Sequence, residues 1–140
     1  MRILAIALAI LLLSTAHAAE SAALNIVLKD GHSVELSPSL LAGLTRQQVV
    51  STSHGKTAKH EGYNLREILK AAGVDPVEGL RGKQLAGYLT VTATDGYTVV
   101  FALAELDPTL GNTQVVLADS QDGQPLHASD GPWRLVVPGD

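Results

Sequence analysis

The chain of 140 residues contains no cysteine, and this absence excludes several kinds of chemistry. Without thiols the protein forms no disulfide, has no thiolate nucleophile and offers no soft sulfur ligand to a transition metal. Aromatic residues are also scarce, at 4% of the chain, and only one is a tryptophan. We therefore expect burial of aliphatic side chains alone to stabilise the fold.

The sequence also lacks a basic stripe. Its formal net charge is −4, and the Lys and Arg residues are scattered along the chain. Nucleic acids and anionic membrane surfaces attract clustered positive charge, so neither is an expected partner. A glycine-rich phosphate loop and a Gly-x-Ser-x-Gly nucleophile motif are also absent from the sequence.

The first residues have the features of an export signal. Arg2 precedes an unbroken apolar run from Ile3 to Leu13, and Ala16-His17-Ala18 follows as a small-x-small cleavage site. A membrane-spanning helix needs about 20 apolar residues, and this run is much shorter. The pattern predicts a signal peptide at residues 1–18 and a single domain at residues 19–140. The expected product is periplasmic or secreted, with no membrane attachment after cleavage.

Short strands with turn signals between them dominate the rest of the chain. Alternation of apolar and polar residues predicts a hairpin at 89–102, with Asp95-Gly96 at its turn. Further strands are predicted at 24–28, 33–36, 47–53, 114–118 and 133–137, with a polar loop at 54–60. Ser37 and Pro38 predict the start of a short helix. No strand-helix-strand rhythm is present, which favours an α+β, mostly β domain.

One longer helix is expected after Asn64. This residue is a suitable N-cap, and Glu67 stands three positions later, as in a capping box. Apolar residues then recur on one face, and Gly73 is placed to end the helix in a left-handed conformation. The predicted apolar face consists of Leu65, Ile68, Leu69 and Ala72. We expect it to pack against the sheet that contains Val91 and Val99.

Five short motifs follow one another in the order found in a known family. They comprise Gly62, Leu65, Ile68 and Leu69; Asp95, Gly96 and Tyr97; Leu117 and Ala118; Asp122, Gly123, Pro125 and Leu126; and Pro132, Arg134, Val136 and Pro138. In this respect the chain resembles the oxidoreductase molybdopterin-binding domain, over roughly residues 45–138. The resemblance implies the sulfite-oxidase-type fold, with mixed sheets and one main helix.

The chain departs from that family in three ways. Enzymes of the family hold molybdenum through a cysteine thiolate, which has no counterpart here. Its longer enzymes carry an extensive N-terminal half that helps to enclose the pterin, where this chain has only a short segment. Members commonly continue past the last proline-containing strand, whereas this sequence stops at Asp140. The resemblance therefore implies a member truncated at its C-terminus.

Four residues are candidates for ligand binding. Asp95 and Tyr97 stand in a hairpin turn, where they either face a ligand or simply build the turn. Arg134 interrupts an apolar strand, and it either holds an anionic group or points outward while the preceding Trp133 points inward. Arg81 lies beside Gly82 and Lys83, a pattern that suits a phosphate or carboxylate as well as a solvated connector. Together they predict a cleft for an anionic ligand.

Histidines give a weaker indication of metal binding. His54 and His60 flank the predicted loop, and Glu61 stands beside the second of them. Imidazole and carboxylate groups bind Zn²⁺ or Cu²⁺, but this spacing matches no standard site. Solvated loop histidines are the alternative interpretation, and no metal is expected.

The sequence thus favours a small exported binding module that carries no catalytic residue and no cofactor. Its expected partner is an anionic small ligand or another protein. The alternative is a molybdopterin-dependent oxidoreductase, or a subunit of one, whose missing parts a partner chain supplies.

Overall fold

The computed structural model of this chain describes residues 24–139, and the predicted signal peptide lies outside them. The strands are β1 (Asn25–Val27), β2 (Ser33–Glu35), β3 (Arg46–Ser53), β4 (Lys56–Asn64), β5 (Tyr88–Thr92), β6 (Thr98–Ala102), β7 (Val116–Gln121), β8 (Gln124–Pro125) and β9 (Arg134–Val136). The helices are α1 (Pro38–Ala42), α2 (Leu65–Ala71), the 3₁₀ helix η1 (Gly82–Ala86) and α3 (Leu103–Leu106). This content confirms the predicted α+β, mostly β class.

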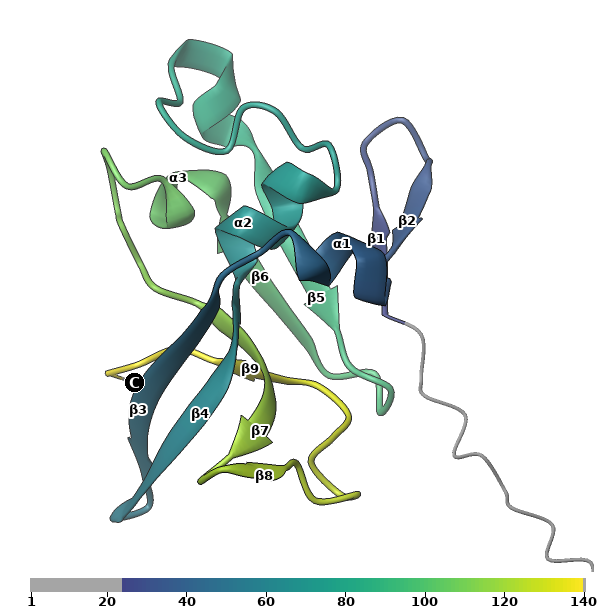
Figure 1. Cartoon of the computed structure of the whole chain (residues 1–140). Coiled ribbons are helices and arrows are strands. Elements are labelled where there is room, and N and C mark those ends of the chain that lie inside the picture. Colours follow the sequence, from purple (N-terminus) through teal and green to yellow (C-terminus); the bar gives the residue numbers. More distant parts are fainter. Residues whose placement is uncertain (1–23, 140) are drawn as a thin grey trace, which may run out of the picture.

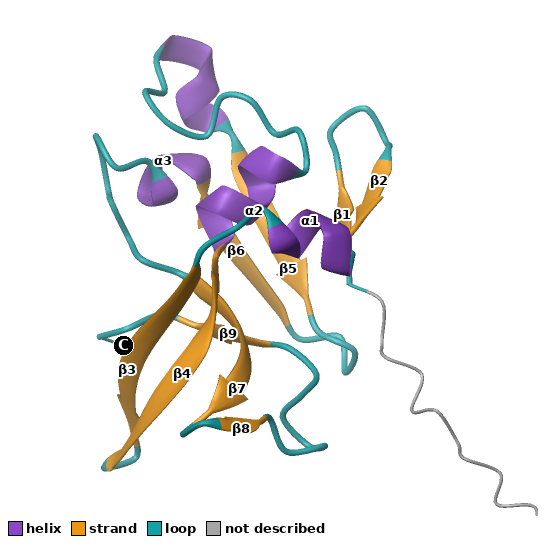
Figure 2. Ribbon diagram, in the orientation of Figure 1, coloured by secondary structure: helices purple, strands orange, loops and turns teal. Residues whose placement is uncertain are grey.

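The strands form one larger sheet and two separate hairpins (Figure 1). The sheet has five strands in the order β3-β4-β7-β8, and β9 also pairs with β7. The pairs β1-β2 and β5-β6 are two-stranded, and every pairing is antiparallel. The helices gather at the end of the molecule away from the β3-β4 turn (Figure 2). No helix within residues 24–139 has both the length and the apolar character needed to cross a bilayer.

The β5-β6 hairpin follows the alternation seen in the sequence. Leu89 and Val91 face inward and are partly buried, while the alternate residues Tyr88, Thr90 and Thr92 are exposed. On β6, Val99 and Phe101 take the same inward positions. The turn at residues 93–97 closes with a hydrogen bond from the Ala93 nitrogen to the Tyr97 oxygen. The predicted hairpin is therefore confirmed, one residue longer at its start.

Helix α2 is capped at both ends by its own sequence. Asn64 accepts a hydrogen bond from the Arg66 nitrogen at 2.9 Å, as an N-cap should. Gly73 adopts φ +97°, and the following Val74 nitrogen bonds to the Leu69 oxygen, which forms a Schellman motif. The predicted capping box is wrong in its second half. Glu67 accepts instead from Arg66 Nε at 3.4 Å, because the arginine side chain lies beside it.

The apolar face of α2 connects two parts of the core. Leu65 and Leu69 pack with Phe101 and Leu106, and Val91 and Val99 lie against this cluster. Ile68 joins a second cluster with Leu36 and Leu117. The exposed fractions of these side chains are 6% for Leu65, 1% for Ile68 and 2% for Leu69. The predicted packing against the sheet of Val91 and Val99 is confirmed for Leu65 and Leu69 and is wrong for Ile68, which packs against Leu36 and Leu117.

A buried carboxylate ties α3 to the connection before η1. Asp107 is 0% exposed and accepts hydrogen bonds from the Leu80 and Thr109 nitrogens and from the Thr109 hydroxyl, each at 2.7 Å. Burial raises the pKa of Asp107, but these hydrogen bonds outweigh it and lower the pKa to about 2. Two of the donors belong to the neighbouring Thr109, but the Leu80 nitrogen lies 27 positions away, so the contact between the two segments was not predictable from the sequence.

The predicted loop at residues 54–60 is wrong. His54 and Gly55 form a tight two-residue turn with φ of 52° and 74°, and β4 begins at Lys56. Much of β4 near the turn is exposed on both faces, so it lacks the apolar residues that signal a strand. Its backbone nonetheless pairs with β3 along the whole length of that strand, from Arg46 to Ser53.

Replacing Leu69 by alanine tests this account of the core. We expect a loss of about 2–5 kcal/mol in the free energy of unfolding, because the cavity opens between α2 and the β5-β6 hairpin. Leu110 is 48% exposed, so the same change at Leu110 should cost under about 0.5 kcal/mol. Urea denaturation measures both variants, and equal losses would contradict the assigned core.

Candidate functional site

The pairing of β4 with β7 contains a β-bulge. Glu61 lies opposite Ser120, but the next residue, Gly62, lies opposite Ala118, so the register shifts by one. Asp119 is the extra residue on β7, without a partner on β4. A bulge bends its strand and re-aims the side chain at the extra position. It thereby directs the Asp119 carboxylate toward Arg46 on β3.

Gly62 is required at this bulge. A Cβ added to it would overlap the Leu117 carbonyl oxygen and would lie 2.6 Å from the Ala118 Cα. These are backbone atoms, so no side-chain rotation would relieve the contact. The close approach of the two backbones is therefore possible only with glycine at position 62.

At Asp119, β7 also changes its pairing partner on the edge that faces away from β4. Residues 116–118 pair with β9, whereas Ser120 and Gln121 pair with β8. Asp119 stands at the resulting fork, where its carbonyl oxygen accepts a hydrogen bond from the Leu126 nitrogen at 3.1 Å. An open cleft of about 510 Å³ lies at this fork, and we call it the fork cleft. Its lining consists of Asp119, Ser120, Gly123, Gln124, Pro125, Leu126, Pro132 and Trp133.

One wall of the fork cleft is fixed by a bidentate ion pair. Arg46 Nη1 and Nη2 donate to the two Asp119 carboxylate oxygens at 2.9 and 2.7 Å. The guanidinium lies 5.2 Å from the centre of the Tyr63 ring and also donates to the Tyr63 hydroxyl at 3.3 Å. The hydrogen bonds from Arg46 hold the pKa of Asp119 below its usual value, so this carboxylate is ionised at neutral pH.

The rest of the lining is mainly apolar. The half-buried indole of Trp133, the two prolines and Leu126 supply apolar surface, while Ser120 and Gln124 add a hydroxyl and an amide. Asp119 is the one charged residue of the lining. Such a surface suits an apolar or aromatic group that also makes a few hydrogen bonds. This lining does not favour an anion, because its one charged residue, Asp119, is negative.

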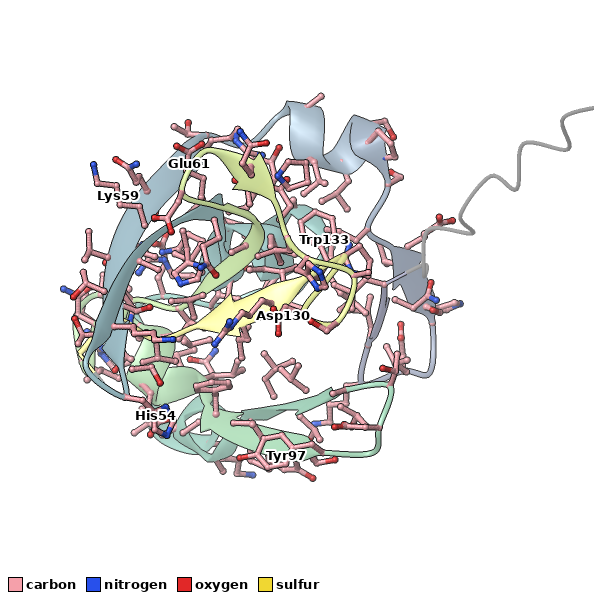
Figure 3. The ribbon with its side chains drawn as sticks, turned by 90° about the horizontal axis from the view of Figure 1, so that it is seen from below. His54, Lys59, Glu61, Tyr97, Asp130 and Trp133 are labelled. Carbon is pink, nitrogen blue, oxygen red and sulfur yellow. The ribbon has the colours of Figure 1, made fainter. Side chains whose placement is uncertain are left out.

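The structure does not bring the four predicted ligand residues together. Arg81 precedes η1 at the open end of the β5-β6 hairpin, whereas Asp95 and Tyr97 form the turn at its other end (Figure 1). The Asp95 carboxylate accepts from the Tyr97 nitrogen at 2.9 Å, as a turn-building residue does. Tyr97 is 69% exposed and lies apart from Trp133 (Figure 3).

Arg134 follows Trp133 directly but lies on the opposite face of the sheet. Trp133 joins the cluster around Leu117, whereas Arg134 is opposite Ala118 and exposed. This is the predicted inward tryptophan with an outward arginine. Arg134 is therefore absent from the lining of the fork cleft, as are Arg81, Asp95 and Tyr97.

The two histidines considered as metal ligands have different surroundings. His54 occupies the exposed β3-β4 turn, while His60 is 2% exposed in the interior of β4. Within residues 24–139, no group of three or more His, Cys, Asp or Glu side chains is arranged to hold a metal ion.

Sequence reasoning missed the residues that build the fork cleft. Arg46 and Asp119 are 73 positions apart, and only the bulge register makes them neighbours. Trp133 was identified as an inward residue, but nothing in the pattern placed it beside the Asp122-Gly123 turn. The scarcity of aromatic residues was the one available signal, since the sole tryptophan of a chain often marks a contact surface.

The chain is similar to a known protein family. The sequence model of a family described as the oxidoreductase molybdopterin binding domain matches residues 35–140. A search of curated proteins found no match to the chain.

Replacing Gly62 by alanine tests the bulge. The added methyl group collides with the backbone of β7, so we expect the free energy of unfolding to fall by about 1–3 kcal/mol or more. Gly43 offers a matched control, because its φ is −81° and the nearest atom to an added Cβ is 3.8 Å away. Chemical denaturation that shows equal stability for the two variants would contradict the close approach at Gly62.

Proposed function

This chain belongs to the oxidoreductase molybdopterin-binding domain family, and we propose that it is a binding domain that keeps the family scaffold without a thiolate-held molybdenum centre. Its partner is a segment of another protein that docks in the fork cleft. The observation that carries this proposal is the open cleft beside the Arg46–Asp119 pair, which contains the sole tryptophan of a chain without cysteine.

The donor groups of this chain do not fit a molybdenum centre of the kind that the family resemblance implies. Such a centre takes a soft thiolate from the protein, and the sequence contains no cysteine. The hard carboxylate of Asp119 is already engaged in two hydrogen bonds with Arg46. This chain therefore lacks the ligand that such a centre takes from the protein.

The shape of the fork cleft favours a protein segment over an enclosed small molecule. Small-molecule sites bury about 70–90% of their ligand, whereas this cleft is open to solvent. Trp133, Pro125 and Leu126 form an apolar surface of the kind that anchors an interface. The Ser120 hydroxyl and the Gln124 amide stand beside it and supply hydrogen bonds to a partner backbone. We expect an uncharged segment with an apolar side chain against the indole.

Family membership favours one alternative, a subunit of a molybdopterin-dependent oxidoreductase. In that arrangement a partner chain supplies the thiolate and encloses the pterin. The two proposals differ in what occupies the fork cleft, a peptide segment in the first and a pterin in the second, and this difference is measurable.

We further propose that the protein is exported. The support is the basic residue, the short apolar run and the small-x-small site at residues 1–18. The intact mass of protein recovered from outside the cytoplasm should correspond to a chain that begins at Ala19. A chain that retains Met1 and sediments with membranes would contradict export.

Tryptophan fluorescence reports occupancy of the fork cleft directly, because Trp133 is the only tryptophan of the chain. We expect one or more members of a library of tryptophan-free, uncharged synthetic peptides to shift its emission saturably. Pterin-6-carboxylate serves as the probe for the alternative proposal. Replacing Leu126 by alanine should weaken peptide binding about tenfold, which is the effect of losing about 1.4 kcal/mol of contact.

Tyr97 provides the control for this experiment. It is 69% exposed and lies outside the cleft, so Tyr97→Ala should leave the affinity unchanged. Saturable binding of pterin-6-carboxylate with no response to any peptide would contradict the proposed partner and support the oxidoreductase subunit. Equal effects of the two substitutions would place the binding site elsewhere.

A further inference from the structure

His60 is a buried imidazole without a hydrogen-bond partner. It lies in β4 opposite Val49 of β3 and Gln121 of β7, and its side chain is almost entirely removed from solvent, at 2% exposure. Its Nδ1 atom makes no hydrogen bond with any described residue. Buried polar atoms are nearly always paired, so an orphaned imidazole nitrogen in the main sheet calls for a physical explanation.

No described residue on the face of the sheet that carries His60 forms a hydrogen bond with its Nδ1 atom. This face holds the apolar cluster of Val49, Val116, Ala118 and Val136, and the polar Gln121 lies opposite His60. Arg134 of β9 extends from the same face, because it lies opposite Ala118, which lies opposite Gly62. Asp122 of the β7-β8 turn is the other charged group near the ring, and its carboxylate accepts from the Lys59 nitrogen at 2.9 Å.

We propose that His60 makes the five-stranded sheet acid-sensitive, because a proton taken up by this buried imidazole is repelled by Arg134 and destabilises the pairing of β4 with β7. His60 lies two residues from Gly62, so the affected pairing is next to the bulge. The mechanism depends on the sheet alone and holds whatever binds in the fork cleft.

The direction of the effect follows from the two states of the chain. In the folded protein burial lowers the pKa of His60, Arg134 lowers it further, and Asp122 opposes them in part. In the unfolded chain the imidazole is solvated and has its ordinary pKa of about 6.5. The unfolded state therefore binds the proton first. Stability is complete above about pH 6.5 and declines as the pH falls toward the lower pKa of the folded state.

Denaturation at a series of pH values between 7.5 and 5.0 tests this proposal on the full mature chain. As the pH falls below about 6.5, we expect the unfolding equilibrium constant of the wild type to rise, by at most about tenfold per pH unit, which is the limit for one proton taken up on unfolding. His60→Phe keeps a ring of similar size but does not titrate, so its stability should change much less over the same range.

His54→Asn is the matched control. His54 is exposed, and asparagine tolerates its φ of 52°, so this variant should keep the wild-type slope. A second measurement covers the case in which His60→Phe does not fold. Arg134→Gln removes the repelling charge, and the NMR titration of His60 should then move to higher pH. A wild-type stability that stays flat, a His60→Phe slope equal to the wild type, or an unmoved titration in Arg134→Gln would overturn the proposal.

Discussion

The contact on which the rest of this structure depends is the close approach of two backbones at Gly62 and Ala118. It is tight enough that a single methyl group at position 62 would overlap the opposite strand. The bulge at this point shifts the register of β4 against β7 by one residue and leaves Asp119 without a partner on β4. A change of one residue in register moves side chains to the other face of a sheet. The Arg46–Asp119 pair and the fork cleft both lie at this bulge.

Much of the fold was predictable because local physics and the final structure agree. The β5-β6 hairpin follows from alternation and an Asp-Gly turn, and α2 follows from its N-cap, its apolar face and Gly73. The β4 strand was not predictable, because its first residues are exposed on both faces and carry no apolar signal. Its pairing comes from the tight turn at His54 and Gly55, which brings the chain back along β3.

The site was harder to predict from the sequence than the fold, for a different physical reason. Its members become neighbours through strand register, and register is a property of pairs of strands rather than of one segment. Nothing near Arg46 in the sequence indicates that Asp119 will accept two of its hydrogen bonds. The four predicted ligand residues were chosen for their chemistry, and the structure spreads them over both ends of one hairpin and the far face of the sheet.

Membership of the family is compatible with the absence of a cysteine thiolate in this chain. The scaffold motifs that match the family lie where they build turns and strand pairs, at the bulge glycine, the hairpin turn and the Asp122-Gly123 turn. The fork cleft, by contrast, presents an indole, two prolines and an already paired carboxylate. These groups suit the recognition of an apolar segment better than the ligation of molybdenum.

The molybdenum content of the mature protein tests this account most directly. The chain should be produced in a host that makes the molybdopterin cofactor, purified without chelators, and analysed by inductively coupled plasma mass spectrometry beside a cysteine-containing family enzyme from the same host. The account predicts molybdenum at the level of the buffer blank for this chain and a stoichiometric amount for the enzyme. Stoichiometric molybdenum in this cysteine-free chain would contradict it.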